Sequence, residues 1–168
     1  RTGGVIPWDV NGNVGVLSSG LQQLRDTNVE LPDGYELNVM HSAFYQQVDR
    51  HAEIPARWVE RTYGFYVDIF EFQELEILNE HGNVTIQLLG PLPDPVWNTC
   101  WSCEVVEVTR TSGPETMTEQ VKRFRIPRDW VFPLRKCQLE TFQITCPAQP
   151  VAYLTHLYGD GFFEPTLW

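Results

Sequence analysis

Three oxygen-bearing side chains stand at alternate positions near the start of the chain: Asp9, Asn11 and Asn13. Alternate residues of an extended segment project to the same face, so all three can meet one ligand. Hard cations such as Mg²⁺ prefer oxygen ligands, and phosphoryl transfer commonly uses such a metal. The spacing predicts a cation-binding loop, but a site of this kind usually offers carboxylates, and two of these three side chains are neutral amides.

A further acidic candidate, Asp68, lies in the most apolar segment of the chain, residues 65–72. Aromatic and β-branched residues after Gly64 predict a strand there. A carboxylate in such a run is costly to bury unless it is paired. Asp68 is therefore a candidate functional residue, and the alternative is an edge-strand aspartate that points into water.

Alternating strands and short helices are expected to position these side chains. Strands are predicted on both sides of the cation loop, and Ser18 or Ser19 can cap a short helix. A later helix over residues 149–158 should end at Gly159, and residues 160–168 should form a loop. Further strands are predicted over residues 35–40, 65–72, 83–89, 105–109, 121–126 and 139–145, with a hairpin turn at 112–114. This pattern predicts a mixed α+β fold.

Length and charge limit the function classes. A chain of 168 residues suits one domain with a real core. A net charge of −10 disfavours nucleic-acid binding through phosphate neutralisation. Half of the basic residues nevertheless fall in one short region. These residues form either a local anion-binding site or ordinary solvated charges on strands and loops. They are Lys122, Arg123, Arg125, Arg128, Arg135 and Lys136.

Four cysteines, Cys100, Cys103, Cys137 and Cys146, allow two disulfides in three pairings. A Cys₄ zinc site and a redox-active dithiol at residues 100–103 are the alternatives. Asn83 opens an N-glycosylation sequon, which has meaning only in a secretory compartment. Together these features favour a secretory-pathway protein, in the Golgi lumen or outside the cell.

No apolar run reaches the ~18 residues that cross a bilayer, and no signal-peptide pattern is present. The chain opens at Arg1 without a methionine. We therefore expect a fragment of a longer chain, in which any membrane anchor would lie upstream.

Four blocks, in this order, resemble the LicD/fukutin family of phosphotransferases. The first is R-T-G-G-V-I-P-W-D at residues 1–9, and the second is a glycine followed by an aromatic strand that bears an aspartate, within residues 57–72. The third comprises residues 126–127 and 132–134. The fourth is the closing run through Cys146-Pro147, Tyr153-Leu154, Tyr158-Gly159-Asp160 and Pro165.

The resemblance implies a nucleotidyltransferase-like core with a mixed β-sheet and a few helices. It also implies transfer of a phosphorylated alcohol, such as ribitol phosphate or phosphocholine, from a CDP-linked donor to a glycan. Mg²⁺ or Mn²⁺ would be held by Asp9, Asn11, Asn13 and Asp68, with Asp9 and Asp68 in the catalytic roles. The implied phosphate-binding residues are Arg1, Arg57, Arg61, Arg125 and Arg128.

Two departures from the family pattern favour an alternative. Asn11 and Asn13 replace two motif aspartates, and the family's Gly-Ser element upstream of Arg1 is not in this chain. The alternative is a catalytically degenerate relative that binds a glycan or a partner. A different class is a secreted, disulfide-stabilised domain with a tryptophan-rich binding surface, built from Trp8, Trp58, Trp97, Trp101 and Trp130. The sequence does not predict the oligomeric state.

Overall fold

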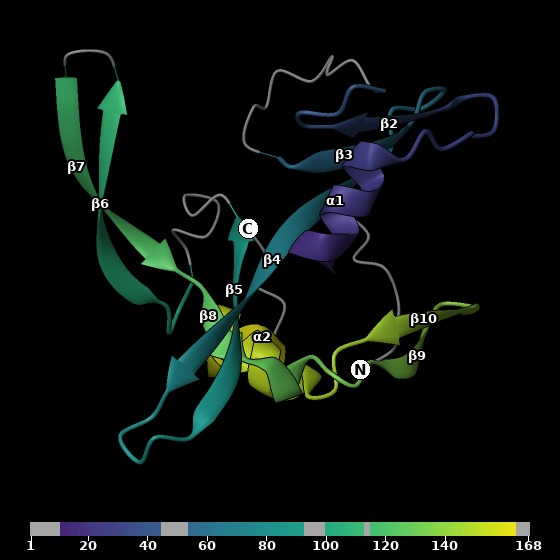
Figure 1. The fold of residues 1–168 in the computed structure, drawn as a ribbon. Helices are drawn as coiled ribbons and strands as arrows, with labels where there is room; N and C mark the ends of the chain where they lie inside the picture. The colour runs from purple at the N-terminus through teal and green to yellow at the C-terminus, as the bar shows by residue number, and fades with distance from the viewer. Residues whose placement is uncertain (1–10, 45–53, 93–99, 113–114, 164–168) are drawn as a thin grey trace. The chain divides into compact units, whose positions relative to one another are not determined.

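A computed structural model describes residues 11–44, 54–92, 100–112 and 115–163 of the chain (Figure 1). The backbone divides into two compact units. The sheet unit comprises Ile6–Glu74 and Gly90–Val96, and the disulfide unit comprises Arg1–Val5, Leu75–Leu89 and Trp97–Trp168. Strands β4 (Tyr66–Leu78) and β5 (Val84–Leu92) each contribute residues to both units. The expectation of one domain over residues 1–168 stays a prediction.

The sheet unit contains β1 (Asn11–Leu17), α1 (Ser18–Asp26), β2 (Tyr35–Val39), β3 (Ala56–Glu60) and the first part of β4. β2 pairs with β3, and β3 pairs with β4, both antiparallel. β1 runs parallel to β4, from Asn11 opposite Tyr66 to Leu17 opposite Phe72. The first part of β4 is therefore an interior strand with β3 and β1 as neighbours.

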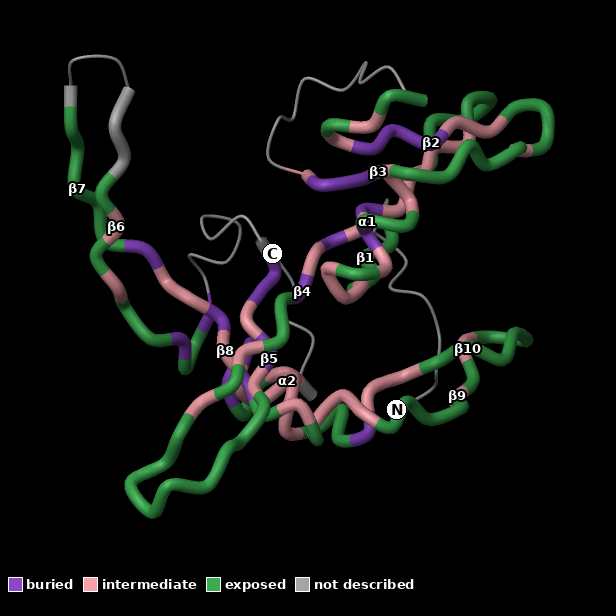
Figure 2. The backbone as a smooth tube through the Cα atoms, viewed as in Figure 1, coloured by how far each residue is buried: buried purple, intermediate pink, exposed green. Residues whose placement is uncertain are grey.

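Helix α1 covers one face of this sheet. Leu21 of α1 is fully buried against Leu37 and Val39 of β2 and Ala56 of β3. Partly buried neighbours complete the cluster: Val16, Leu24, Leu31, Trp58 and Ile69. Buried stretches of backbone accordingly follow β2, β3 and the start of β4 (Figure 2). Because side chains alternate along a strand, the residues between these apolar positions project to the opposite face.

Gly15 helps to hold β1 in register against β4. A Cβ atom at this position would lie 2.7 Å from Cε2 of Phe72, so the strands fit together there because glycine has no side chain. Gly15 pairs with Phe70, two residues along from the pair formed by Asn13 and Asp68. This close approach supports the alignment of Asn13 with Asp68.

The disulfide unit combines hairpins with the second helix. β8 (Arg125–Pro127) pairs antiparallel with β5. β6 (Glu104–Ser112) pairs with β7 (Glu115–Arg123), and β9 (Arg135–Leu139) pairs with β10 (Phe142–Cys146). The helical segments are η2 (Arg128–Trp130), α2 (Pro150–Tyr158) and η3 (Asp160–Phe163). The chain is therefore α+β, as predicted. Within the described residues, no helix is long and apolar enough to span a membrane.

Helix α2 begins and ends as its sequence predicts. Pro150 stands in the first turn, where its missing N–H costs nothing, and Gly159 follows the last turn with φ 77°. Phe124 packs edge-on against Tyr153 at 5.2 Å and against His156 at 5.3 Å. Burial raises the pKa of Tyr153 to about 12, with a smaller contribution from the neighbouring Tyr158.

This raised pKa predicts alkaline destabilisation. Between pH ~10 and ~12 the Tyr153 phenol is ionised in the unfolded chain and neutral in the folded one, so stability falls as the pH rises through that window. A shift from 10.0 to about 12 corresponds to roughly 2–3 kcal/mol once the pH exceeds both values. Urea unfolding at pH 9 and pH 11 should show a smaller loss in Tyr153→Phe than in the wild type. Tyr63→Phe, at an exposed position, should leave the loss unchanged; equal losses in all three proteins would refute the assignment.

Three local predictions were wrong. Residues 139–145 form no single strand: β9 and β10 make a hairpin that turns at Glu140, where φ is 52°. β1 begins at Asn11, so Asn11 and Asn13 lie on a strand rather than in a loop. Residues 160–163 form a short 3₁₀ helix where a loop was expected. Strand β3, which was not predicted, places Arg57 beside β4.

Candidate functional site

A row of four polar residues crosses the sheet unit on the face opposite α1. Asn13 of β1 pairs with Asp68 of β4, Asp68 pairs with Arg57 of β3, and Arg57 pairs with Asn38 of β2. Residues directly opposite one another on neighbouring strands project to the same face. Asn38, Arg57, Asp68 and Asn13 therefore form one line of side chains, called the polar row below.

The centre of the polar row is a buried ion pair. Arg57 Nε donates to Asp68 Oδ1 at 2.5 Å, and the two side chains are only 14% and 8% exposed. The Arg57 guanidinium also lies 4.2 Å from the ring centroid of Tyr66, two residues before Asp68 on the same face. Asp68 is thus an interior, paired carboxylate, and the alternative of an edge-strand aspartate in water was wrong.

Asn38 ends the row with a polar atom that has no partner among the residues that the structure describes. The residue is 7% exposed, and its Oδ1 is buried without a hydrogen-bond partner in the described structure. An unsatisfied buried acceptor costs about 1–3 kcal/mol. Native proteins rarely keep such a deficit, so Asn38 is a candidate for contact with a ligand. Asn38 was not predicted from the sequence, although, like Asp68, it is a polar residue between apolar neighbours, Leu37 and Val39.

The charges of the polar row sum to zero. Asp68 is the one carboxylate of the four residues, and Arg57 neutralises it. Asn13, at the other end, is an exposed neutral amide. A divalent cation is held mainly by anionic oxygen ligands, and this row offers no net negative charge. The row instead presents amide donors and acceptors, an ion pair and the ring of Tyr66.

The structure aligns only part of the predicted metal set. Asn13 lies opposite Asp68, as a shared site requires. The backbone of Asn11 lies opposite Tyr66, and its side chain falls outside the described residues. Asp9 and Arg1 also fall outside them, so their predicted roles stay predictions.

The other predicted phosphate-binding arginines are engaged elsewhere. Arg61 lies 3.8 Å from Glu36 on the surface of the sheet unit. In the disulfide unit, Arg125 pairs with Glu104 at 2.5 Å, and Arg128 lies over the ring of Phe132 at 4.5 Å. Of the predicted arginines that the structure describes, Arg57 is the one that belongs to the polar row.

The cysteines form two disulfides, Cys100–Cys103 and Cys137–Cys146. The second connects the two strands of the β9–β10 hairpin. This pairing excludes the Cys₄ zinc alternative for the structure as it stands. Disulfides persist in oxidising compartments, so both bonds are compatible with a secretory or extracellular setting.

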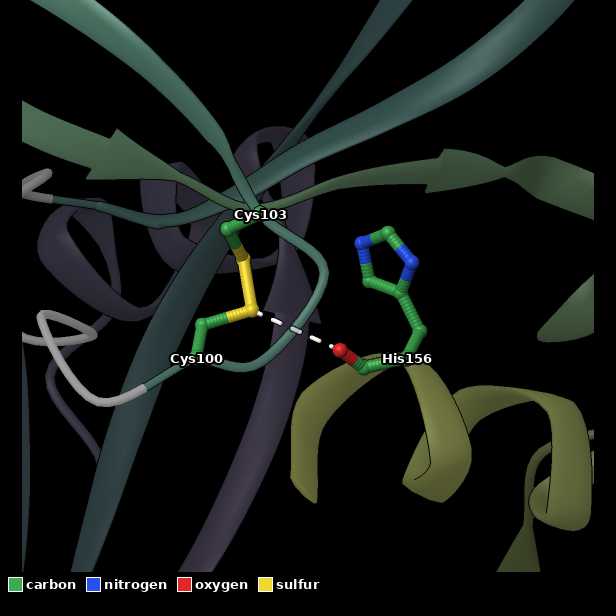
Figure 3. A group of neighbouring side chains, drawn as sticks. All are labelled: Cys100, Cys103 and His156. Carbon is green, nitrogen blue, oxygen red and sulfur yellow. Dashed lines mark hydrogen bonds between the residues drawn. A yellow bond between two sulfur atoms is a disulfide. The ribbon is translucent and has the colours of Figure 1, made fainter. Parts of the chain in front are cut away.

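The Cys100–Cys103 loop covers the carboxyl end of α2. Trp101 N donates to the carbonyl of Leu157 at 2.8 Å, and Ser102 N donates to that of His156 at 3.0 Å. These bonds satisfy carbonyls that a helix end leaves without partners. The Sγ atom of Cys100 lies 3.6 Å from the carbonyl oxygen of His156 (Figure 3). A disulfide sulfur carries no hydrogen, so this approach is a contact rather than a donated bond.

This position argues against a redox-active dithiol of the usual kind. Reactive Cys-x-x-Cys thiolates are commonly stabilised by the positive end of a helix. Here the loop lies at the negative end of α2, which opposes a free thiolate. The described geometry therefore favours a structural disulfide.

The predicted glycosylation site lies on the surface. Asn83 is exposed in the turn between β4 and β5, where its N donates to Asn79 Oδ1 at 2.8 Å. An attached glycan would therefore point to solvent.

Trp58 packs in the α1-covered core and stacks on Tyr35 at 4.6 Å, whereas Trp101 is 74% exposed. Trp58 lies in the sheet unit and Trp101 in the disulfide unit.

No protein-family model, curated protein or solved structure matches this chain.

Proposed function

We propose that this chain is a LicD/fukutin-like domain that binds a glycan through the polar row and has lost metal-dependent transfer. The proposal rests mainly on the Arg57–Asp68 ion pair, in which Arg57 neutralises the one carboxylate of the row. The motif positions that would add negative charge hold Asn11 and Asn13. These charges support the loss of metal binding.

A glycan suits the remaining groups. Asn13 offers both a donor and an acceptor to sugar hydroxyls, and Asn38 Oδ1 is an acceptor that a hydroxyl can satisfy. Aromatic rings such as Tyr66 pack against the apolar faces of sugars. The disulfides support an oxidising setting, and within it we propose the Golgi lumen or the extracellular space.

The second candidate is the active, metal-dependent transferase. The register of β1 on β4 favours it, because Asn13 and Asp68 are brought opposite each other as a shared cation site requires. Amide oxygens can ligate Mg²⁺ or Mn²⁺. In this version the chain moves ribitol phosphate or phosphocholine from a CDP-linked donor to a glycan.

Two assays separate the candidates. The proposal predicts glycan-array binding that is unchanged by a metal chelator, and no transfer from CDP-ribitol or CDP-choline in Mn²⁺. Asn13→Ala should weaken binding about tenfold without changing stability, since Asn13 is exposed. Asn83→Ala, at another exposed asparagine, is the matched control. Transfer that requires Mn²⁺ would reject the proposal in favour of the transferase.

Asn38 provides a prediction with opposite effects on stability and binding. Asn38→Leu removes the unsatisfied buried acceptor, so we expect the free energy of unfolding to rise by about 1–2 kcal/mol while glycan binding falls. Urea unfolding and the glycan assay measure the two effects. Asn79→Ala is the contrasting control, because Asn79 Oδ1 accepts hydrogen bonds from His81 and Asn83 and its removal should destabilise. A destabilised Asn38→Leu that still binds glycan would show that Asn38 is an ordinary core residue.

A further inference from the structure

Three potential metal ligands meet at the carboxyl end of α2. One ligand atom from each of Cys100, Cys103 and His156 lies within 4.8 Å of the other two. Both cysteines are buried, and the imidazole lies beside the disulfide (Figure 3). His156 comes from the helix, and the cysteines come from the loop that covers its end.

His156 has an unused nitrogen. Its Nε2 is buried and has no hydrogen-bond partner among the described residues. The ring is held edge-on by Phe124 at 5.3 Å and by Trp130 at 5.9 Å. An oriented imidazole whose Nε2 has no hydrogen-bond partner among the described residues is available to ligate a metal.

The spacing of the cysteines suits zinc once the disulfide is open. Cys-x-x-Cys is the usual half of a structural zinc site, and the Cα atoms here are 5.5 Å apart. Sulfurs on a tetrahedral zinc lie about 3.8 Å apart, as follows from Zn–S bonds of ~2.3 Å. The two sulfurs must therefore separate and the imidazole must move by about an ångström. Three protein ligands leave the fourth position for water.

We propose that reduction of the Cys100–Cys103 disulfide converts this cluster into a zinc site with both thiolates and His156 as ligands. A dithiol reductant supplies two electrons and two protons, its own thiols become a disulfide, and Cys100 and Cys103 become thiols. Zn²⁺ then replaces the two thiol protons, which are released to solvent. The disulfide and the zinc site are thus alternative states of the same loop.

The surroundings favour the bound form over free thiolates. The negative end of α2 opposes a free thiolate and attracts a cation. Lys122 Nζ donates to the carbonyl of Cys100 at 2.5 Å, which places a positive charge beside the cysteines. One Zn²⁺ with two thiolates is neutral, so Lys122 does not oppose the complete site.

Co²⁺, which replaces Zn²⁺ and gives charge-transfer bands with thiolates, tests the proposal on the full chain. After reduction with a phosphine, we expect one equivalent of Co²⁺ to bind with thiolate bands, and Zn²⁺ to displace it. The oxidised chain should show no bands. The double variant Cys137→Ser/Cys146→Ser should keep them. His156→Gln should weaken binding at least about 100-fold, and His81→Gln, at an exposed histidine, should not.

Alkylation of the reduced wild type gives an answer that does not depend on how the variants fold. Zn²⁺ should protect Cys100 and Cys103 from iodoacetamide and leave Cys137 and Cys146 reactive, as mapped by mass spectrometry. Equal modification of all four cysteines, or protection confined to Cys137 and Cys146, would overturn the proposal. Undiminished Co²⁺ affinity in a folded His156→Gln would overturn it as well.

Discussion

Asp68→Ala should lower the free energy of unfolding by about 3–5 kcal/mol, because it leaves the buried Arg57 guanidinium without its carboxylate. Arg57→Ala should cost a similar amount for the reciprocal reason. Most single substitutions cost far less, so the effect identifies the pair as a structural element of the polar row. Urea unfolding followed by tryptophan fluorescence measures it.

The sheet unit offers both a control for this loss of stability and a second variant that should restore it. Arg61→Ala removes the exposed pair with Glu36, 3.8 Å apart, and should cost less than about 1 kcal/mol. The double variant Arg57→Met/Asp68→Leu should recover much of the lost stability, since apolar side chains of similar volume often replace buried ion pairs without penalty. If Asp68→Ala costs no more than Arg61→Ala, the buried pair is not the centre of the row.

The double variant Asn11→Asp/Asn13→Asp should increase Mn²⁺ affinity by at least about 100-fold. One pair of unit charges at ~4 Å and an effective dielectric of ~20 is worth about 4 kcal/mol before desolvation, and each 1.4 kcal/mol is tenfold in affinity. A 100-fold gain in affinity therefore corresponds to about 2.8 kcal/mol. The attraction between two new carboxylates and a divalent ion exceeds this value even after a large desolvation penalty. Calorimetric titration measures the gain.

The control variant tests whether the position of the two new charges determines the Mn²⁺ affinity. Asn79→Asp/Asn83→Asp adds the same two charges in the exposed β4–β5 turn and should leave Mn²⁺ affinity unchanged. The Asn11→Asp/Asn13→Asp variant should also be less stable without metal, because the new carboxylate at position 13 would face Asp68, and Mn²⁺ should restore its melting temperature. Equal Mn²⁺ affinity in the two double variants would contradict a cation site at these positions.

The strands that contain the polar row were predictable where the residue types and the side-chain periodicity indicate the same element. The apolar run around Asp68 predicted a strand because aromatic and β-branched residues fit a pleated, half-buried surface. Helix α2 was predictable from its apolar face and from Gly159 at its end. The turn at Glu140 was missed because a positive φ at a residue other than glycine leaves little trace in sequence.

The contacts between strands were not predictable from the sequence. Nothing in residues 54–60 identified Arg57 as the partner of Asp68, since pairing depends on the register of β3 on β4. The alternate spacing of Asn11 and Asn13 did predict a shared face. Their position on a strand came from β1 pairing in parallel with a distant segment, a long-range contact that local pattern does not encode.

Calorimetric titration of the wild-type chain with Mn²⁺, with and without CDP-ribitol, tests the central claim most directly. A polar row without net charge predicts no Mn²⁺ binding at millimolar concentration in either case, and no release of CMP when a glycan acceptor is added. Sub-millimolar Mn²⁺ binding by the wild type, accompanied by transfer of ribitol phosphate, would contradict the claim and identify the chain as a metal-dependent transferase.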